Sequence, residues 1–538
     1  MNKQTQGAVF GVLSFLALFR IGLLQSTEDG ILLPFSPNMN NDEYNDEYNN
    51  EYIFGYKKDY DYYAKEDATL SADSNIYKDI NIDEVIHKKD LNTEKSNMEN
   101  SNTEDPMTDD PYTENNILNV NCNKFDSLFN FSDTIIKRLG KDFHNSPFTR
   151  CLNFEGNQIE SVASGAFNSL PALEYLNLAG NSISFVFSFN GHNNLKVLIL
   201  ANQSLYYERI LEISGEYPEL RYLDLSNNKI SSINRQNDYF QDVYSSTYEI
   251  RVFPRLSYLD LSYNKLTTFN NNFLFNRNIT NLYLTNNNLY HVDLHIYSNL
   301  VELVLEGNDI RGIVDYSNSE YVWIDEMPEL KYLWISNNRI TKIDERILKK
   351  MNKLVTLDLS NNELESISIA QNYEFNSLEN IYLDHNKLFS ISMRHRLSNL
   401  SILSVTYNEL KEIVPYFVDA PILKKLYLSN NGINAIHEHA FSKLELLEEL
   451  YLQNNVLEQL PNKWSQNLRN LRYLNLSNNA FKTLESLSLI QSLPLIKIDF
   501  INNPIIYMKV EVLQNLPKNA TIYLIPQFKD NELSKRSL

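Results

Sequence analysis

The sequence predicts an α/β solenoid, a curved, right-handed coil with a parallel β-sheet on its concave face and irregular, 3-10 or short helical segments on its convex side. The first observation is a pattern of leucine and asparagine that recurs about 15 times from about residue 152, at a spacing of about 24 residues. The second is length, because 538 residues exceed a single compact domain. One unit cannot bury its own apolar face, so the units must stack.

In each unit a Leu-x-Leu sequence is followed three residues later by asparagine, as in Leu176-Asn-Leu178-Ala-Gly-Asn181. Alternate side chains of a strand point in opposite directions, so the leucines enter the interior and the x residues face outward. Neighbouring units therefore align their strands into one parallel sheet. The other units reach this position at Asn157, Gln203, Asn228, Asn264, Asn287, Asn308, Asn338, Asn362, Asn386, Asn408, Asn431, Asn455, Asn479 and Asn503.

The asparagine itself has a predicted role in the turn that leaves each strand. Its side-chain amide both donates and accepts hydrogen bonds, so it can satisfy backbone groups of adjacent coils that are buried from water. A ladder of such amides is expected along the solenoid. Apolar residues in the second half of many units, such as Phe167 and Phe441, are expected to fill the convex side of the core.

Residues 1–26 are predicted to be a signal peptide. Lys3 supplies the positive charge, Ala8–Leu24 is mostly apolar, and cleavage is expected near Ser26. Arg20 limits the uninterrupted apolar run to about a dozen residues, which is short for a membrane span and favours cleavage over a retained anchor. No later stretch is long and apolar enough to predict a transmembrane segment.

Residues 27–119 are predicted to be a disordered acidic arm, because they hold about 23 acidic residues, about 7 lysines and few aliphatic residues. Acidic neighbours of tyrosine are the setting of tyrosine sulfation in secreted proteins. The alternative is a solvating spacer. The sulfation candidates are Tyr44, Tyr48, Tyr52, Tyr60, Tyr62 and Tyr63.

The rest of the chain divides into an N-terminal cap with the first repeat (120–157), repeats (158–505), and a C-terminal cap and tail (506–538). The chain has two cysteines, Cys122 and Cys151, at the start of the repeats. In an oxidising compartment we expect them to pair, and the bridge would contribute about 3 kcal/mol. Two unrelated buried thiols are the alternative.

With these repeats the chain resembles extracellular leucine-rich repeat proteins of the typical 24-residue class, similar in pattern to Toll-type receptor ectodomains and small leucine-rich proteoglycans. The resemblance covers about Cys122 to Leu524 and implies a scaffold that binds other macromolecules. Two departures stand out. The signalling domain of Toll-type receptors is missing from this sequence, and no cysteine follows Asn503-Pro504, where many extracellular members have a cysteine-rich cap.

The outward strand positions predict an unusually aromatic concave face. Tyrosine and tryptophan provide large contact areas at modest entropic cost and are enriched at interface hot spots. We therefore expect a partner on the middle of this face, while the alternative is that the rings stack on one another and shield the leucine core. The candidate partner-binding residues are Tyr283, Tyr332, Trp334, Tyr382, Tyr427 and Tyr451.

Six Asn-x-Ser/Thr triplets are candidate N-glycosylation sites, which agrees with a secreted protein. A glycan on Asn475, an outward strand position, would obstruct the C-terminal third of the concave face. The candidates are Asn130, Asn202, Asn278, Asn399, Asn475 and Asn519.

No enzyme motif is present, and His437-Glu438-His439 has no further ligands nearby in the sequence, so we expect no catalytic residue, cofactor or metal. The formal charge of -20 argues against a nucleic-acid partner. The predicted function is a secreted, non-enzymatic binding or adhesion protein of the extracellular matrix or cell surface, with a protein or glycan partner. A soluble innate-immune recognition factor is the alternative, and an enzyme a remote one. A homodimer through the concave face would compete with a ligand.

Overall fold

The computed structural model describes residues 128–141, 143–184, 191–204, 207–212, 215–234, 252–270, 277–314, 321–323, 327–369 and 377–524. The chain separates into two compact units, Met1–Thr103 and Glu104–Leu538, and every described residue belongs to the second. The predicted signal peptide, the acidic arm with its six tyrosines, and Cys122 lie outside the described residues.

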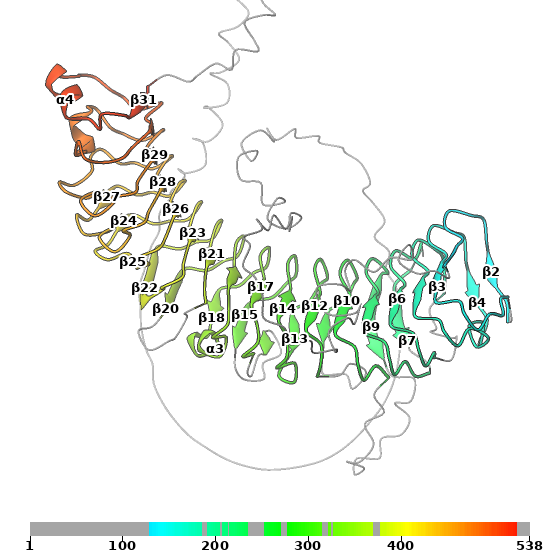
Figure 1. Cartoon of the computed structure of the whole chain (residues 1–538). Coiled ribbons are helices and arrows are strands. Elements are labelled where there is room, and N and C mark those ends of the chain that lie inside the picture. The colour runs from blue at the N-terminus through cyan, green and yellow to red at the C-terminus, as the bar shows by residue number, and fades with distance from the viewer. Residues whose placement is uncertain are drawn as a thin grey trace, which may run out of the picture. The chain divides into compact units, whose positions relative to one another are not determined.

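Within the described ranges, 17 short strands form one parallel sheet that follows chain order (Figure 1). Each strand pairs with the next in register, so that Leu333 aligns with Leu303 on one side and with Leu357 on the other. The strands are β1 (Leu128–Asn130), β3 (Cys151–Asn153), β5 (Tyr175–Asn177), β6 (Val197–Ile199), β8 (Tyr222–Asp224), β10 (Tyr258–Asp260), β12 (Asn281–Tyr283), β14 (Glu302–Val304), β17 (Tyr332–Trp334), β19 (Thr356–Asp358), β21 (Asn380–Tyr382), β23 (Ile402–Ser404), β26 (Lys425–Tyr427), β28 (Glu449–Tyr451), β29 (Tyr473–Asn475), β30 (Lys497–Asp499) and β31 (Thr521–Tyr523). This sheet lies on the inner side of the curve in Figure 1, as predicted.

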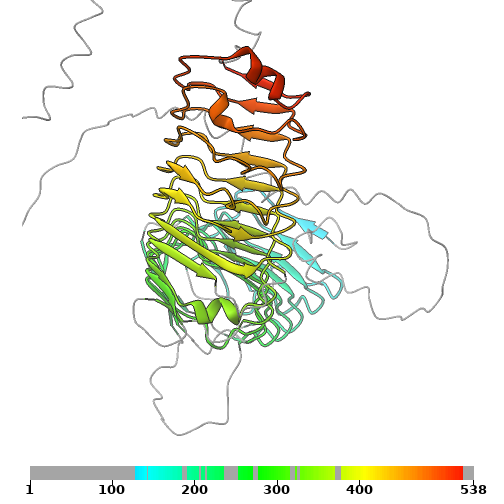
Figure 2. The same cartoon turned by 90° about the vertical axis from the view of Figure 1, so that its left-hand side faces the viewer.

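The outer side of many turns holds smaller parallel sheets, which Figure 2 shows from another direction. Their described strands are β2 (Arg138–Leu139), β4 (Ser161–Val162), β7 (Arg209–Glu212), β9 (Ile230–Asn234), β11 (Thr268–Phe269), β13 (His291–Asp293), β15 (Gly312–Val314), β16 (Val322–Trp323), β18 (Lys342–Ile343), β20 (Ser366–Ile369), β22 (Ser390–Arg396), β24 (Glu412–Ile413), β25 (Val418–Asp419) and β27 (Ala435–Ile436). Helical segments in the described ranges are short: α3 (Glu345–Lys349), α4 (Val510–Asn515) and the 3-10 helix η3 (Glu485–Leu487). The predicted solenoid is confirmed.

The leucine rows fill the interior. Leu357 and Leu359 of one unit are 1% and 0% exposed, and equivalent leucines of neighbouring units are buried in the same way. On the convex side Phe441 packs edge-on against Trp464 with ring centroids 6.1 Å apart. A buried leucine or phenylalanine contributes about 1.5–3 kcal/mol relative to an exposed one, so the stacked rows stabilise the whole array.

The predicted amide ladder is present. Asn386 is typical: its Nδ2 donates to the carbonyl oxygens of Leu359 (2.9 Å) and Leu383 (3.1 Å), while its Oδ1 accepts from the backbone N–H of Leu364 (3.0 Å). One side chain therefore ties its own turn to the preceding coil. Gln203 makes the same type of bonds where glutamine replaces asparagine: its Nε2 donates to the Leu178 carbonyl oxygen, and its Oε1 accepts from the Ile183 N–H.

The residue before each ladder amide adopts the left-handed conformation, with φ of 53° at Asn361. Asparagine and glycine tolerate this conformation best, which explains why so many units end in Asn-Asn.

The last described turn packs apolar side chains against the core. Ile505, Val512 of α4 and Ile522 of β31 are partly buried against the end of the core.

Candidate binding face on the inner sheet

The inner face consists of the side chains that point outward from the 17-stranded sheet. Each strand contributes its first and third residues, and a third outward position follows two residues after the strand. All six predicted partner-binding residues lie on this face and are half-buried. Tyr332 occupies a first position, and the other five occupy third positions. Register places Tyr427 directly beside Tyr451, whereas Val304 separates Tyr283 from Trp334.

Tyrosine rings stack along the N-terminal part of the face. The rings of Tyr222 and Tyr258 are nearly parallel with centroids 4.2 Å apart, and the centroid of Tyr283 lies 5.0 Å from that of Tyr258. The Tyr283 hydroxyl donates to Glu302 Oε2 at 2.6 Å. Tyr283 is therefore held by neighbours on both of its sides.

A second stack lies near the C-terminal end. The centroids of Tyr427 and Tyr451 are 4.5 Å apart, and those of Tyr451 and Tyr473 are 5.0 Å apart. The Tyr451 hydroxyl donates to Glu449 Oε2 at 2.8 Å. Burial, with a smaller effect of Glu449, raises the pKa of Tyr427 to about 12. In these stacks the rings contact one another and cover the leucine core, as the alternative interpretation expected.

The middle of the face is different. Tyr332, Trp334 and Tyr382 are half-buried and have no aromatic ring partner among the described residues. Trp334 is in register with Asp358, which is in register with Tyr382. The rings in this central segment therefore alternate with polar side chains.

Two inner-face aspartates have raised pKa values. Burial is the main cause and raises the pKa of both Asp260 and Asp358 to about 6, while the Ser262 and Ser360 N–H groups oppose the shift. These N–H groups donate to the two carboxylates at 2.8 Å and 2.9 Å. The recurring aspartates thus help to fix the turn that follows each strand.

Glu306 and Asp384 occupy the outward position two residues after their strands, β14 and β21. The sequence analysis did not consider this position. Asp384 Oδ1 accepts hydrogen bonds from Ser404 Oγ at 2.6 Å and from Thr406 Oγ1 at 2.7 Å, and Glu306 Oε1 accepts from Asn337 Nδ2 at 2.9 Å. The alternation of a strand could have identified them, since each follows the second leucine of its repeat by one residue.

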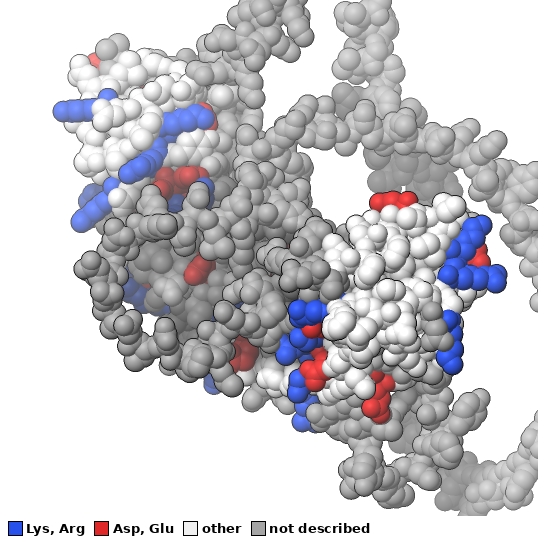
Figure 3. Space-filling view, turned by 45° about the vertical axis from the view of Figure 1, so that its right-hand side comes forward, with Lys and Arg blue, Asp and Glu red and all other residues white. Residues whose placement is uncertain are grey.

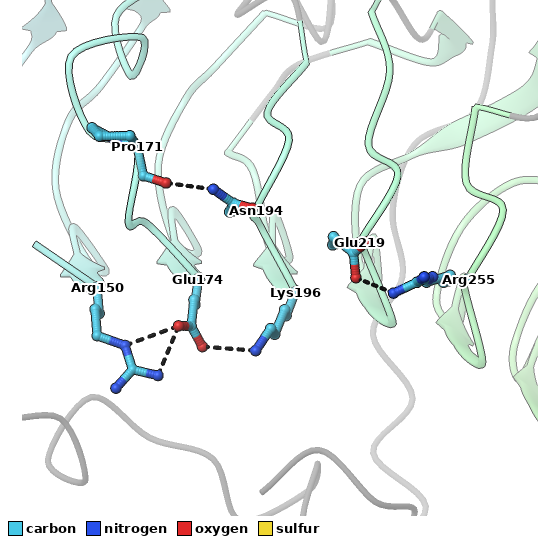
Figure 4. A network of polar contacts seen from close by, with 7 residues as sticks. All are labelled: Arg150, Pro171, Glu174, Asn194, Lys196, Glu219 and Arg255. Carbon is cyan, nitrogen blue, oxygen red and sulfur yellow. Dashed lines mark hydrogen bonds and ion pairs between the residues drawn. The ribbon is translucent and has the colours of Figure 1, made fainter. Parts of the chain in front are cut away.

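Basic side chains pair with acids at the edge where the strands begin. Glu174 bridges Arg150 at 2.7 Å and Lys196 at 3.1 Å, and Arg255 pairs with Glu219 (Figure 4). Figure 3 shows Lys and Arg in separate bands with wide uncharged areas between them. The chain therefore neutralises many acids at this edge with its own cations.

The remaining predicted sites can also be placed. Cys151 is buried in β3, and no cysteine of the described region is free, but Cys122 lies outside it, so their pairing stays a prediction. Asn475 is half-buried, and its Nδ2 donates to the Tyr473 hydroxyl at 3.3 Å. The other glycosylation candidates are exposed: Asn130, Asn202, Asn278, Asn399 and Asn519.

No group of acidic, histidine or cysteine side chains in the described ranges is arranged to hold a metal ion. The same ranges contain no helix long and apolar enough to cross a membrane.

The leucine-rich repeat family model matches residues 150–205, 328–388, 398–457, 421–481 and 447–503, and a second leucine-rich repeat model matches 219–237. Together with the fold, these matches show that the chain contains leucine-rich repeats, and arrays of such repeats form extended concave binding surfaces.

Two curated proteins match short parts of the chain. The mouse transforming growth factor beta activator LRRC32 is 35% identical over 91 residues, which are 16% of this chain and 14% of that protein. Protein halfway of Drosophila pseudoobscura pseudoobscura is 26% identical over 118 residues, 22% of this chain and 18% of that protein. The matches thus span less than a fifth of either relative.

Solved structures with similar folds include the Toll–Spatzle complex of Drosophila, with a TM-score of 0.49 and 16% identity over 74% of this chain and 56% of that one. YopM of Yersinia enterocolitica has a TM-score of 0.48 and 19% identity over 74% of this chain and 79% of that one.

Proposed function

We propose that this chain is a secreted, non-enzymatic binding protein that holds an extracellular protein or glycan on the central segment of its inner face, and that it acts at the matrix or cell surface. The observation that carries the proposal is the contrast within the face: among the described residues, Tyr332, Trp334 and Tyr382 lack the ring partners that the other candidates have. Half-buried rings without partners offer apolar area that a ligand can cover.

A protein partner is favoured over a glycan. The name of the mouse relative describes an activator of transforming growth factor beta, although the likeness spans 14% of that protein. Alternating rings and carboxylates also suit a polypeptide, whose side chains can offer both apolar and charged groups.

The proposal is tested by capture from native extracellular fluid. The secreted full-length chain is compared with the double variant Trp334→Asp and Tyr382→Asp, and bound proteins are identified by mass spectrometry. We expect the variant to lose a partner that the native chain retains. The matched control is Tyr290→Asp, because Tyr290 is 45% exposed and lies outside the inner sheet.

Equal capture by all three forms would overturn the assignment to the central segment. Sedimentation of the same proteins shows whether the inner face is instead used for a homodimer, since the double variant would then dissociate while the control stays associated.

A further inference from the structure

We propose that the partner binds through a basic polypeptide segment, with a Lys or Arg side chain seated above Thr356 between Tyr332 and Asp358. This inference rests on the proposed function and specifies the chemistry of its partner. It follows from a comparison of two places on the same sheet.

At the C-terminal end, β29, β30 and β31 form a complete cation site from the chain's own residues. Lys497 Nζ lies 2.9 Å from Asp499 Oδ2, 5.0 Å from the centroid of the Tyr473 ring and 5.4 Å from that of the Tyr523 ring. The cation therefore has a carboxylate and aromatic faces around it, which are the surroundings that stabilise a partly desolvated ammonium group.

The same arrangement recurs on β17 and β19 without the cation. Tyr332 pairs with Thr356 as Tyr473 pairs with Lys497, and Asp358 follows Thr356 as Asp499 follows Lys497. Thr356 therefore occupies the position of the lysine. Its side chain is short, uncharged and 5% exposed, and its Oγ1 accepts a hydrogen bond from Asn380 Nδ2 at 3.3 Å, so a cation here must come from outside and lie above it.

The described positions around this site hold several carboxylates and no basic residue. Six neighbouring strands, β10, β12, β14, β17, β19 and β21, contribute three outward positions each, and within these described positions Lys, Arg and His do not occur. The acids among them are Asp260, Glu302, Glu306, Asp358 and Asp384.

None of these five carboxylates makes an ion pair in the described structure; each accepts hydrogen bonds from neutral donors. Glu302 accepts from Tyr283 and Asn281, and Asp358 accepts from the Ser360 N–H. Elsewhere on the sheet Lys425 pairs with Glu449 at 3.3 Å. Five unneutralised acids on one face favour a cationic partner.

The spacing of the five carboxylates favours a polypeptide over a single ion. The described acids do not converge into a group that could hold a metal. Asp260 and Asp358 lie on β10 and β19, four strand intervals apart, which corresponds to roughly 19 Å at about 4.8 Å per strand. An extended peptide of about six residues spans this distance, so several of its basic side chains can each meet one carboxylate.

The test uses the full chain and a labelled short peptide of alternating arginine and glycine, with the dissociation constant measured by fluorescence anisotropy. A peptide with citrulline in place of arginine keeps the shape and removes the charge. We expect the arginine peptide to bind at least about tenfold more tightly than the citrulline peptide.

Two variants then locate the site. Thr356→Lys supplies the internal cation that Lys497 provides at the other end, and we expect it to weaken arginine-peptide binding about tenfold or more. Thr356→Gln, of similar length but uncharged, separates charge from bulk and is expected to bind within about twofold of the native chain. Far-ultraviolet circular dichroism confirms that both variants are folded.

Glu306→Gln together with Asp358→Asn keeps the local hydrogen bonds and removes two charges, so it should also bind more weakly. The control is Glu363→Gln, whose carboxylate pairs with Lys387 outside the inner sheet at 2.8 Å. The acidic arm is present in every form. Unchanged binding in Thr356→Lys and in the double variant would therefore assign the peptide to the arm and overturn the inference.

Failure of the inference is distinguishable from failure of the proposed function. If the arginine peptide does not bind but Trp334→Asp and Tyr382→Asp still abolish capture of a partner, the face is a binding site for a partner of other chemistry. If capture is also unchanged, both proposals are wrong.

Discussion

The C-terminal strands and the central strands of the inner sheet carry the same residue types but differ in how those residues are partnered. Near the C-terminus, tyrosines stack on one another and Lys497 pairs with Asp499. In the centre, Tyr332 and Trp334 have no ring partner, and Asp358 has no cation, among the described residues. The difference shows that an outward aromatic residue can be satisfied by neighbours in register, so under the proposed function only an unpartnered ring marks a candidate binding site.

The amide ladder holds the strands of both regions in place. The largest change in the free energy of unfolding is therefore expected from breaking the ladder. Asn386→Ala leaves the Leu364 N–H and the Leu359 and Leu383 carbonyl groups without their partner. We expect the free energy of unfolding to fall by about 3–5 kcal/mol, since each buried unsatisfied group costs about 1–3 kcal/mol. Urea unfolding followed by circular dichroism measures the change.

The control for this prediction is Asn361→Gly, at the exposed left-handed position of the preceding turn, where φ is 53°. Glycine adopts this conformation readily, so the change should stay within about 1 kcal/mol. A loss at Asn386 no larger than this would show that the ladder contributes little stability.

The two aromatic regions should respond to alanine in opposite ways. Tyr451→Ala removes the stack with Tyr427 and the hydrogen bond to Glu449, and we expect it to lower the free energy of unfolding by about 2 kcal/mol. Trp334→Ala should instead weaken partner binding by about 2 kcal/mol or more. Thermal unfolding and titration of the captured partner measure the two quantities separately.

The comparison fails if Trp334→Ala destabilises the fold as much as Tyr451→Ala does while partner binding is unchanged. The central ring would then be part of the structural cover of the core.

The sequence predicted the scaffold well because its determinants are local. The leucine rows and the ladder amides recur within one repeat, and alternation along a strand is enough to assign Leu357 to the core and Asp358 to the surface. The recurring Asn-Asn was visible too, although the left-handed requirement at Asn361 became clear only from the backbone.

The candidate binding face was harder to predict because it depends on which residues become neighbours across strands. The six candidates were chosen by residue type and position, which could not separate the stacked Tyr427 from the unstacked Trp334. The correspondence between Thr356 and Lys497 requires the register of β17 with β19 and of β29 with β30. Unequal repeat lengths, such as the interval from Asn308 to Asn338, obscure this register in the sequence.

The contribution of the central segment to the free energy of unfolding should also depend more on pH than that of the C-terminal strands. Because burial raises the pKa of Asp358 to about 6, the folded chain retains this proton at pH values where the unfolded chain, with a pKa near 3.8, has lost it. This group's contribution to the free energy of unfolding therefore falls as pH rises from about 4 to 6, by roughly 1–3 kcal/mol. Asp260 contributes in the same direction.

Urea unfolding of the native chain and of Asp358→Asn, at pH 4.5 and at pH 7, measures the contribution of Asp358 to the free energy of unfolding. The variant should gain stability relative to the native chain at pH 7 and differ little at pH 4.5. A basic peptide should bind more tightly at pH 7 than at pH 5, because Asp358, near Asp384 and Glu306, is then ionised. An identical pH response in native chain and variant would contradict the assignment.

The smallest effect on the free energy of unfolding, and the sharpest comparison of the two regions, is expected from Lys497→Thr. This change gives β30 a threonine at the position that Thr356 occupies on β19. Asp499 then lacks the ammonium group that lies 2.9 Å away in the native chain, while Tyr473 keeps an open ring face. Loss of this partly exposed ion pair should cost about 1 kcal/mol. In this variant a threonine stands where the lysine lay, beside the same carboxylate and ring. If the carboxylate and the ring are sufficient to bind a cation, the variant should bind a second arginine peptide. The stoichiometry of the titration measures this. An unchanged stoichiometry of one would show that the central segment also needs its neighbouring carboxylates, Glu306 and Asp384, which have no equivalents beside β30.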